Sequence, residues 1–412
     1  MRYSPSLQWA ICLTVLLSVA GFSMPAPVLT PLFLDTEKEL FTALHGLDQV
    51  ARVWWLGAVI LLYPIGQLFG APLFGRYSDK IGRKQVLQFT LLGVATGYLG
   101  MVVAIHTGSL WLLVISRLGA GFFNSNVAIA QAIAADISTP ESKPRLFARI
   151  NMALNLGWII GPLSGGYAAY AWNDYSLPFM FGMSLALVNM LMITLWLPGT
   201  KPNAEQRQQA QARHQQSSRW ALLKDAKLAP LFALTLFSYL AISMYFSYFN
   251  VYTVDVFDFG PREIAWSAVC ISIPMMFGSW AGARLKARMT TSNLGMAGHA
   301  LMAAGMLSLP LMSTLEGFAL TLLFTGVGMT ISELATSLVV SNEASEAQQG
   351  EAMGMYRSVS MGSELAAVAL GSALIMAGVH WVFLAAGTFA AIAGYGFRIR
   401  KQAVARAKLS VA

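Results

Sequence analysis

The sequence predicts an all-α membrane protein with twelve transmembrane helices in two pseudo-symmetric six-helix bundles. Of its 412 residues, 56% are hydrophobic and only 11% are charged, and the mean hydropathy is +0.58. A soluble protein carries about 25% charged residues, so this composition argues against a soluble enzyme, a disordered protein or a nucleic-acid reader. Twelve long apolar runs and an internal repeat lead to the same class.

Each apolar run is long enough to cross a bilayer, which takes about 20 helical residues because the hydrocarbon core is about 30 Å thick. The runs are continuous rather than alternating, which excludes a β-barrel. We interpret the first as an uncleaved span, because it continues past a signal-peptide length and similar runs follow it. The predicted spans are residues 9–30, 54–74, 86–104, 110–135, 150–171, 177–197, 228–252, 264–283, 294–312, 318–341, 352–378 and 381–397.

The basic residues determine the predicted orientation. With the N-terminus in the cytoplasm, all but four of the 27 Lys and Arg residues lie on the cytoplasmic side, the exceptions being Lys38, Arg52, Arg117 and Arg262. The net charge of +8 is therefore a topology signal, and we expect no nucleic-acid partner. We expect a monomer in the bacterial inner (cytoplasmic) membrane, in contact with membrane lipid, with both termini cytoplasmic.

A polar, glutamine-rich interval divides the spans six and six. It predicts a cytoplasmic linker, residues 199–227, between an N-terminal bundle, residues 1–198, and a C-terminal bundle, residues 228–412. The halves look like repeats, because one fixed offset places Gly75 on Gly282, Gly121 on Gly328 and Asp136 on Glu343. Such repeats predict two bundles related by an axis along the membrane normal, with the substrate site near mid-membrane.

The connection between spans two and three carries a family resemblance. Residues 75–84 read Gly-Arg-Tyr-Ser-Asp-Lys-Ile-Gly-Arg-Lys, which closely resembles the G-x-x-x-D-x-x-G-R-K loop of the major facilitator superfamily. Gly75 and Gly82 permit close helix approach and a tight turn, and Asp79 offers a carboxylate to a helix N-terminus or a basic partner. The resemblance implies the major facilitator fold and a cytoplasmic gate of Gly75, Asp79, Gly82, Arg83 and Asp136. The second half has Lys286 where Asp79 stands, which leaves open whether it forms a comparable latch.

The fourth span resembles the Arg-containing fourth-helix motif of the same superfamily. Arg117, Gly121, Asn124 and Ala128 are spaced by three and four residues, which places them on one helical face. A guanidinium inside a membrane is normally paired or faces a water-filled cavity. We expect Arg117 to act in proton coupling or gating, the alternative being an arginine that snorkels to the outer interface. Asn124 is a candidate substrate-binding residue.

The fifth span matches the antiporter motif of drug–proton exporters in the superfamily. Residues 157–166 fit G-x-x-x-G-P-x-x-G-G at every fixed position, with Gly157, Gly161, Pro162, Gly165 and Gly166. Glycines make a smooth face for tight packing on a neighbouring helix, and a proline bends a helix. The resemblance implies a helix that seals one side while the other opens. The first span, with residues 21–27, is a weaker match to the Gly- and Pro-containing first-helix motif of these exporters.

Two carboxylates inside predicted spans are the candidate proton carriers. Glu333 lies in span ten, and Glu364 lies in span eleven on a stripe with Arg357. Burial disfavours the charged form of a carboxylate, so such a group can load and release a proton near neutral pH. Glu333 is also a candidate for pairing with a cationic substrate. The alternative for each is a static hydrogen bond between helices.

Span seven has an aromatic face. Tyr245, Tyr248, Phe249 and Tyr252 recur at i, i+3, i+4 and i+7. Such a face could line a cavity for planar or cationic molecules through stacking and cation–π contacts. We therefore include Tyr245, Tyr248 and Phe249 as candidate substrate-binding residues. The alternative is an aromatic belt at the outer interface.

The leading hypothesis for function is a proton-driven exporter of small amphipathic or cationic compounds by alternating access. No G-x-x-x-x-G-K-[ST] loop is present to bind ATP, and no catalytic constellation indicates an enzyme. Cys12 and Cys270 lie in apolar runs and the five histidines lack metal-ligand spacing, so we expect no metal and no cofactor, with protons as the coupling ion. The alternatives are a proton-coupled or facilitated transporter of one metabolite, and a flippase for lipids or lipid-linked precursors.

Overall fold

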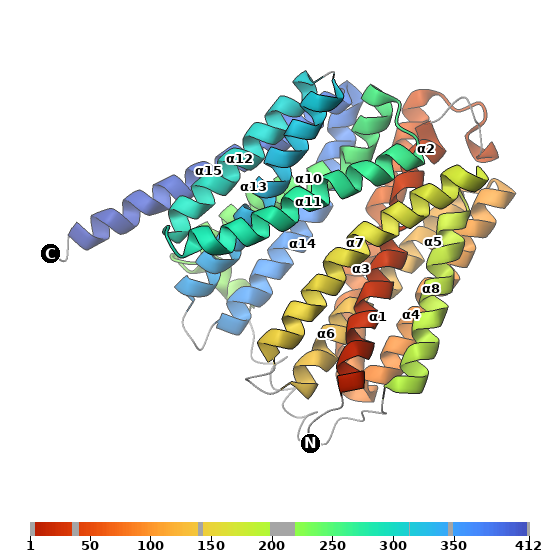
Figure 1. Cartoon of the computed structure of the whole chain (residues 1–412), viewed down its shortest axis with the longest axis horizontal. Coiled ribbons are helices and arrows are strands. Elements are labelled where there is room, and N and C mark those ends of the chain that lie inside the picture. Colours follow the sequence, from red (N-terminus) through yellow and green to blue (C-terminus); the bar gives the residue numbers. More distant parts are fainter. Residues whose placement is uncertain are drawn as a thin grey trace. The chain divides into compact units, whose positions relative to one another are not determined.

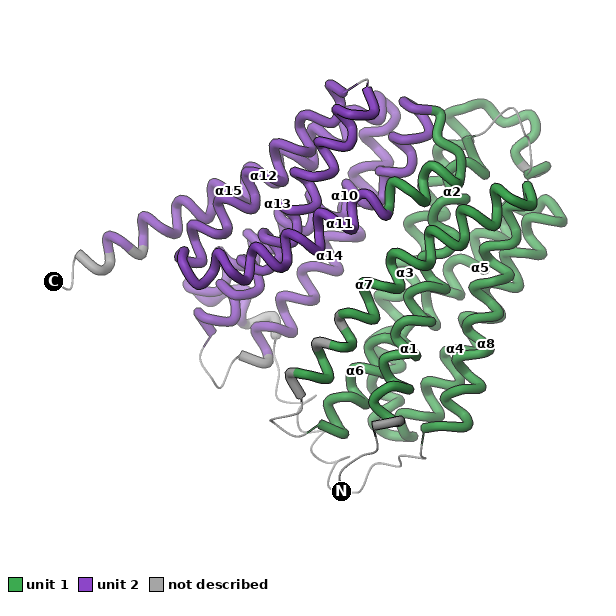
Figure 2. The backbone as a smooth tube through the Cα atoms, viewed as in Figure 1, with its two compact units in different colours: residues 1–215, 258–268 green, residues 216–257, 269–412 purple. Residues whose placement is uncertain are grey.

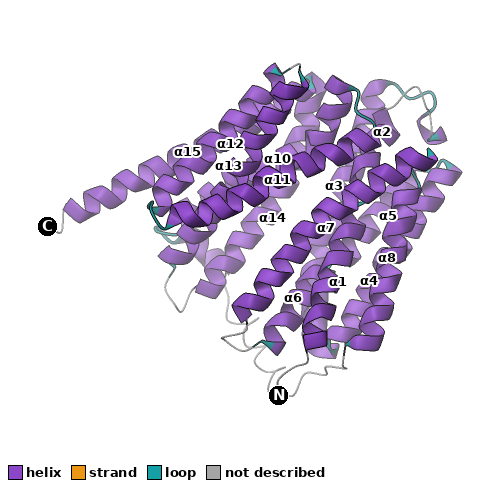
Figure 3. Ribbon diagram, in the orientation of Figure 1, coloured by secondary structure: helices purple, strands orange, loops and turns teal. Residues whose placement is uncertain are grey.

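The computed structural model describes residues 5–34, 41–138, 143–197, 219–312, 314–344 and 349–409. Every regular element in these ranges is helical, and they contain no strand (Figure 3). Most of the predicted linker, residues 198–218, lies outside them. Twelve helical segments are long and apolar enough to cross a membrane, which confirms the predicted all-α membrane fold for the described residues.

The described residues of the first part of the chain, up to Leu197, form eight α-helices, whose arrangement is drawn in Figure 1. They are α1 (Pro5–Ser23), α2 (Ala26–Leu34), α3 (Gln49–Ile81), α4 (Arg83–Thr107), α5 (Leu110–Phe123), α6 (Asn126–Ile137), α7 (Lys143–Trp172) and α8 (Leu177–Trp196), with one 3₁₀ turn, η1 (Thr42–Leu44). Capping residues fix some of the ends. Asp48 and Ser109 accept hydrogen bonds from the backbone N–H groups of Ala51 and Leu112, as helix N-caps do.

From Arg219 onward, the described residues form six further α-helices. They are α10 (Ala229–Phe257), α11 (Pro261–Lys286), α12 (Thr291–Ser308), α13 (Leu315–Glu343), α14 (Gln349–Leu374) and α15 (Val379–Leu409), with the 3₁₀ turns η2 (Arg219–Lys224), η3 (Leu309–Leu311) and η4 (Ile375–Ala377). Thr290 and Thr314 cap α12 and α13 through their side chains.

Two predicted spans are not continuous helices, which corrects the sequence prediction. Span one divides into α1 and α2 at Met24 and Pro25, where proline cannot donate a backbone hydrogen bond to the preceding turn. Span four divides into α5 and α6 at Asn124 and Ser125. Asn124 has φ −77° and ψ 70°, outside the helical region, so α5 ends at Phe123. Membrane transporters place binding sites at such discontinuities, because unwound backbone offers free polar groups there.

Clustering of backbone contacts divides the chain into two compact units (Figure 2). Unit 1 comprises residues 1–215 and 258–268, and unit 2 comprises residues 216–257 and 269–412. The first turns of α11 therefore group with unit 1, whereas the sequence analysis assigned all of residues 228–412 to the second bundle.

Each unit has an apolar core of its own. In unit 1, one cluster joins Leu7 and Ile11 of α1, Leu87 of α4, Ile133 of α6 and Ile150 of α7. These residues lie near the end of the bundle where α3 ends and α4 begins, so they support the polar contacts at that end. In unit 2, the corresponding cluster draws on α10, α12, α13, α14 and α15, with Phe232, Leu294, Val339, Met355 and Phe397 among its members.

Candidate functional site

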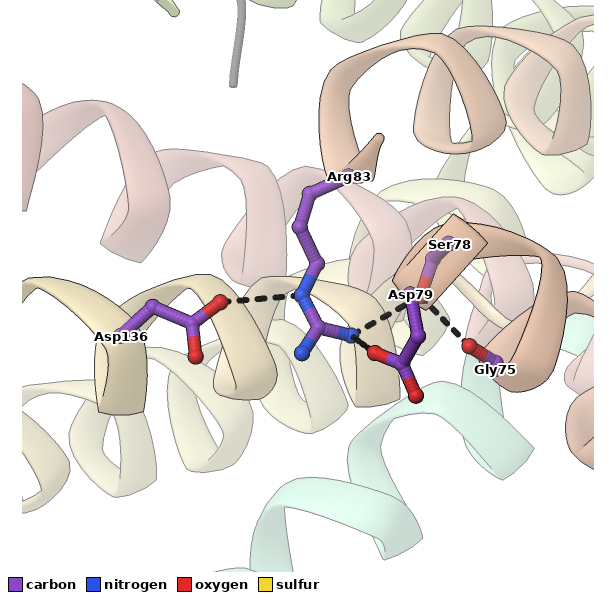
Figure 4. A network of polar contacts seen from close by, with 5 residues as sticks. All are labelled: Gly75, Ser78, Asp79, Arg83 and Asp136. Carbon is purple, nitrogen blue, oxygen red and sulfur yellow. Dashed lines mark hydrogen bonds and ion pairs between the residues drawn. The ribbon is translucent and has the colours of Figure 1, made fainter. Parts of the chain in front are cut away.

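The predicted gate is a polar network in which Arg83 joins three helices (Figure 4). Arg83 is the first residue of α4, and its guanidinium pairs with Asp79 of α3 at 2.8 Å and with Asp136 of α6 at 3.0 Å. It also donates to Ser78 Oγ at 2.8 Å, and Ser78 donates in turn to the carbonyl of Gly75 at 2.7 Å. One cation between two carboxylates therefore ties α3, α4 and α6 together.

The connection that carries this motif is a single residue rather than a loop. Gly82 alone separates α3 from α4, with φ 125° and ψ 141°, a region that is essentially restricted to glycine. The tight turn predicted at Gly82 is thus present. The close helix approach expected at Gly75 is not, because a Cβ added there would meet no atom within 4 Å. Gly75 takes part through its carbonyl instead, which accepts a hydrogen bond from Ser78 Oγ one helical turn later.

The two repeats form different latches from the same acidic position. Asp136 ends α6 and pairs with Arg83 on α4, whereas its counterpart Glu343 ends α13 and pairs with Arg400 on α15 at 2.6 Å. Lys286 lies at the end of α11, where the first repeat has Asp79. The second half therefore has a latch, but a different helix supplies its arginine.

The antiporter-motif helix α7 packs closely on α1. A Cβ added at Gly157 would lie 2.8 Å from Val19 Cβ, and one at Gly161 would lie 2.5 Å from Ala20 O. A Cβ at Gly165 would lie 2.7 Å from Met24 Cγ, so the three glycines form one seam against α1 and the residue that follows it. Ser23 Oγ donates across the seam to the carbonyl of Gly157 at 3.1 Å.

The remaining motif residues lie beside this seam. A Cβ at Gly166 would lie 2.7 Å from Ala265 Cβ, so this glycine packs on the start of α11, within unit 1. Pro162 lies inside α7, which is assigned as one helix from Lys143 to Trp172. A bend at Pro162 stays a prediction.

The break in span four borders a small cavity in unit 1. Asn124, Asn126, Tyr98 and Ser18 are among its lining residues, and its volume is about 10 Å³. This volume suits about one water molecule and not a transported compound. Two polar groups at the break have local partners, because Gln67 donates to the carbonyl of Asn124 at 3.4 Å and Thr90 donates to Asn126 Oδ1 at 2.8 Å. The buried hydroxyl of Ser125 has no hydrogen-bond partner among the described residues. Asn124 thus lies at a helix break of the kind at which transporters place binding sites, but the cavity beside it is too small for a transported compound.

Arg117 is a buried cation without a carboxylate partner in the described residues. Its side chain is 8% exposed, which contradicts the alternative of an arginine that snorkels to the surface. Its guanidinium carbon lies 4.5 Å from the centre of the Tyr63 ring, while Nε and Nη1 have no hydrogen-bond acceptor. The cation is therefore held by the ring's π-face. The helical face predicted from Arg117 to Ala128 does not form, because the break at Asn124 separates the two residues.

The two membrane carboxylates lie in one polar cluster of unit 2. Glu333 on α13 interacts electrostatically with Tyr239 of α10 and with Arg357 of α14. Glu364 also interacts with Arg357, which precedes it on α14 by two helical turns. The charge of Arg357 therefore acts on both carboxylates, although among the described residues it forms an ion pair with neither.

Two tyrosines of this cluster were missed by the sequence analysis. The hydroxyls of Tyr239 and Tyr356 lie 3.0 Å apart, which extends the contacts of Glu333 across α10 and α14. In the sequence, each of these tyrosines is only one hydroxyl-bearing residue within an apolar run, in span seven or span eleven, and nothing around it indicates a functional role. Contacts between helices cannot be read from the spacing within either one.

The aromatic face of α10 is packed in the core of unit 2. Tyr245, Tyr248, Phe249 and Tyr252 are all at most 5% exposed. Tyr245 stacks on Phe249 with ring centres 5.2 Å apart, and Tyr252 donates to the carbonyl of Leu309 at 2.8 Å. Tyr248 lies 2.8 Å from the hydroxyl of Ser372 on α14. Their burial contradicts the alternative of an exposed aromatic belt at the interface, whereas a role of Tyr245, Tyr248 and Phe249 in substrate binding stays a prediction.

Comparisons with known proteins connect this fold to transporters. A family model described as the Major Facilitator Superfamily matches residues 11–363. The tetracycline resistance protein, class H, of Pasteurella multocida is 31% identical over 193 residues, which are 46% of this chain and 44% of that protein. A probable triacylglyceride transporter of Mycobacterium bovis is 29% identical over 160 residues, which are 39% of this chain and 30% of that protein. The chain thus matches less than half the length of these curated relatives.

Solved structures show the same fold over nearly the full chain. The POT family transporter PepTSo aligns with a TM-score of 0.76 and 12% identity, over 97% of this chain and 98% of that one.

Proposed function

Because the chain belongs to the major facilitator superfamily, we propose that it exports small amphipathic or cationic compounds in exchange for protons by alternating access. The observation that carries this proposal is the placement of Glu333 and Glu364 around the charge of Arg357 in unit 2. The glycine seam of Gly157, Gly161 and Gly165 supports the alternating-access part of it. Backbones that meet without intervening side chains can separate and close again with little repacking, as a helix that seals one side must do. The similarity to a tetracycline resistance protein supports export of a compound of this kind.

The proposed coupling site is the polar cluster of unit 2. The charge of Arg357 acts on both Glu333 and Glu364. With one proton on the pair, one carboxylate is neutral and the other balances Arg357, so the cluster as a whole carries no net charge. Release of that proton leaves one excess negative charge, which a cationic substrate would neutralise. Proton and cation therefore compete for the same cluster, as exchange requires. One charge crossing 100 mV supplies about 2.3 kcal/mol, to which the pH difference adds.

We propose that the Arg83 network forms a cytoplasmic gate in a bacterial inner membrane. With twelve spans, the end of span two and the end of span four lie on the face where the N-terminus lies. Asp79 and Asp136 end those spans, and both contact Arg83. The excess of basic residues on this face supports its cytoplasmic location, with both termini cytoplasmic. Arg117, buried in unit 1 over Tyr63, is proposed to act in coupling between the gate and the cavity of span four.

A lipid substrate is the second candidate, because a probable triacylglyceride transporter is also similar to this chain. Such a function predicts movement of a water-insoluble molecule and no exchange of protons for soluble dyes. The glycine seam is a packing device that serves either function, so the two candidates differ in what the protein transports and not in how the seam is built.

The test uses purified protein in liposomes that contain a pH-sensitive dye, with an imposed proton gradient. A panel of cationic dyes and antibiotics is added, and proton movement is compared between the wild type, Glu333→Gln and Glu364→Gln. We expect at least one compound to trigger proton movement, and at least one of the two substitutions to reduce it ten-fold or more.

The matched control is Glu316→Gln. Glu316 is an exposed carboxylate in the first turn of α13, the same helix as Glu333, and it should leave proton movement unchanged. Silence of folded wild-type protein across the panel would contradict export of cationic compounds. Equal activity of both glutamine variants and the wild type would contradict the assigned proton site.

A further inference from the structure

An apolar groove lies between α7 and the start of α11, two segments that both belong to unit 1 (Figure 2). Its volume is about 430 Å³. Apolar and aromatic side chains form most of it, with one charged residue. The lining residues are Ile160, Leu163, Ser164 and Tyr167 of α7, and Arg262, Ala265 and Trp266 of α11, all within unit 1. None of them takes part in the gate, the coupling cluster or the seam.

The groove begins at one face of the membrane and runs toward its interior. Span five ends at Trp172 and span eight begins at Pro261, and these two ends lie on the same face because two spans, six and seven, separate them. Tyr167 and Trp266 are 59% and 53% exposed, and tyrosine and tryptophan are enriched at membrane interfaces. Ile160 lies about two turns deeper along α7 and is exposed as well. The groove therefore offers exposed apolar and aromatic side chains within membrane-spanning helices, a surface that suits a lipid acyl chain.

Arg262 gives the groove a positive end. Its guanidinium carbon lies 5.1 Å from the centre of the Tyr170 ring, which holds the side chain near the groove. Within the described residues, no carboxylate lies within ion-pair distance of Arg262. It is also one of the few basic residues on the face opposite the gate. An apolar channel with an uncompensated cation at its interfacial end complements a molecule with an apolar chain and an anionic head.

We propose that this groove is a binding site for an anionic phospholipid. One acyl chain lies along Ile160, Leu163 and Tyr167, and the phosphate contacts Arg262 at the membrane surface. The hydrocarbon region offers no water to fill the groove, so a lipid chain is the molecule available to cover its apolar wall. An arginine at the surface favours anionic headgroups, and one basic residue changes the affinity for them by about five-fold.

The test measures quenching of tryptophan fluorescence by brominated lipids in nanodiscs. The probe is phosphatidylglycerol with brominated acyl chains, present as a minor component in phosphatidylcholine, and it is compared with brominated phosphatidylcholine at the same fraction. The signal of Trp266 is the difference between the wild type and Trp266→Phe. We expect half-maximal quenching of this signal at about five-fold less phosphatidylglycerol than phosphatidylcholine, and we expect Arg262→Gln to abolish that preference.

Two matched controls separate a site from general contact with lipid. Trp111 begins α5 at the same face and is 67% exposed, so the difference signal from Trp111→Phe should show no headgroup preference. Arg149 lies 5.5 Å from the Trp9 ring elsewhere in unit 1, and Arg149→Gln should leave the preference at Trp266 intact. Equal quenching of Trp266 by the two lipids in the wild type would overturn the proposal. That comparison remains decisive if Arg262→Gln does not fold, and a preference that survives in a folded Arg262→Gln would overturn it equally.

Discussion

Replacement of Gly161 by alanine tests the seam between α7 and α1. The added methyl would lie 2.5 Å from Ala20 O and against Ser23 Oγ, and the carbonyl belongs to the backbone of α1 and cannot rotate away. Overpacking of this kind costs about 1–3 kcal/mol. Alanine is also about 1 kcal/mol more favourable than glycine inside a helix, which offsets part of that cost.

Gly119→Ala isolates the steric cost. Gly119 lies inside α5 of the same unit, and a Cβ added there meets no atom within 4 Å. Both substitutions gain the same helix preference, so their difference is the overpacking alone. We expect Gly161→Ala to be less stable than Gly119→Ala by about 1–3 kcal/mol, a factor of about 5 to 150 in the folded-to-unfolded ratio.

The two cysteines of the chain supply the assay. Cys12 is buried on α1 and Cys270 is exposed, so in a Cys270→Ser background only unfolding of unit 1 exposes a thiol. The midpoint of denaturation, followed with a fluorogenic thiol reagent in detergent, should fall for Gly161→Ala and not for Gly119→Ala. A Gly161→Ala protein as stable as Gly119→Ala would refute the seam as a close-packed contact.

Three other substitutions test the turn, the buried cation and the coupling cluster. Gly82→Ala places a side chain at φ 125°, which costs about 1–3 kcal/mol of folding stability, and the same thiol assay should show that loss. Unchanged stability would show that residue 82 does not adopt this backbone conformation between α3 and α4. Arg117→Met removes a buried charge that has no carboxylate partner in the described residues, so the variant should be at least as stable as the wild type while transport falls ten-fold or more. A large loss of stability, or full transport, would contradict that role. Tyr239→Phe removes the hydroxyl between Glu333 and Tyr356, so it should cost only about 0.5–1.5 kcal/mol of stability yet shift the pH profile of proton movement in the liposome assay. A pH profile that coincides with the wild type would exclude the hydroxyl from coupling.

The spans were predictable because hydropathy depends on each segment separately. A bilayer sets the required length and polarity of every helix, so the twelve segments could be found without any knowledge of their neighbours. The glycine motif of α7 was predictable for a similar reason, since its spacing alone places Gly157, Gly161 and Gly165 on one face.

The errors concern what each helix face meets. Spacing placed Tyr245, Tyr248 and Phe249 together on α10 but could not show that α13, α14 and α15 cover them. The mean hydropathy over a window of residues also conceals a local break in a helix. Span four was therefore interpreted as one helix, although the polar pair Asn124 and Ser125 marked the point where α5 ends. Shared interactions such as those of Arg357 depend on three helices at once and left no pattern in any one of them.

The strengths of the contacts indicate how such a protein could change state. The Arg83 and Arg400 pairs are partly exposed, with side chains 21% and 22% exposed, and pairs of this kind contribute about 0.2–1 kcal/mol each. Such latches select a conformation without fixing it, because a ligand can shift a two-state equilibrium only by its own difference in affinity. The seam of α7 stabilises the protein through close packing and not through charge. One methyl group added there costs more folding free energy than one of the ion-pair latches contributes. Residues on the seam should therefore affect folding, whereas Arg83 and Arg400 should affect mainly the balance between inward-facing and outward-facing states.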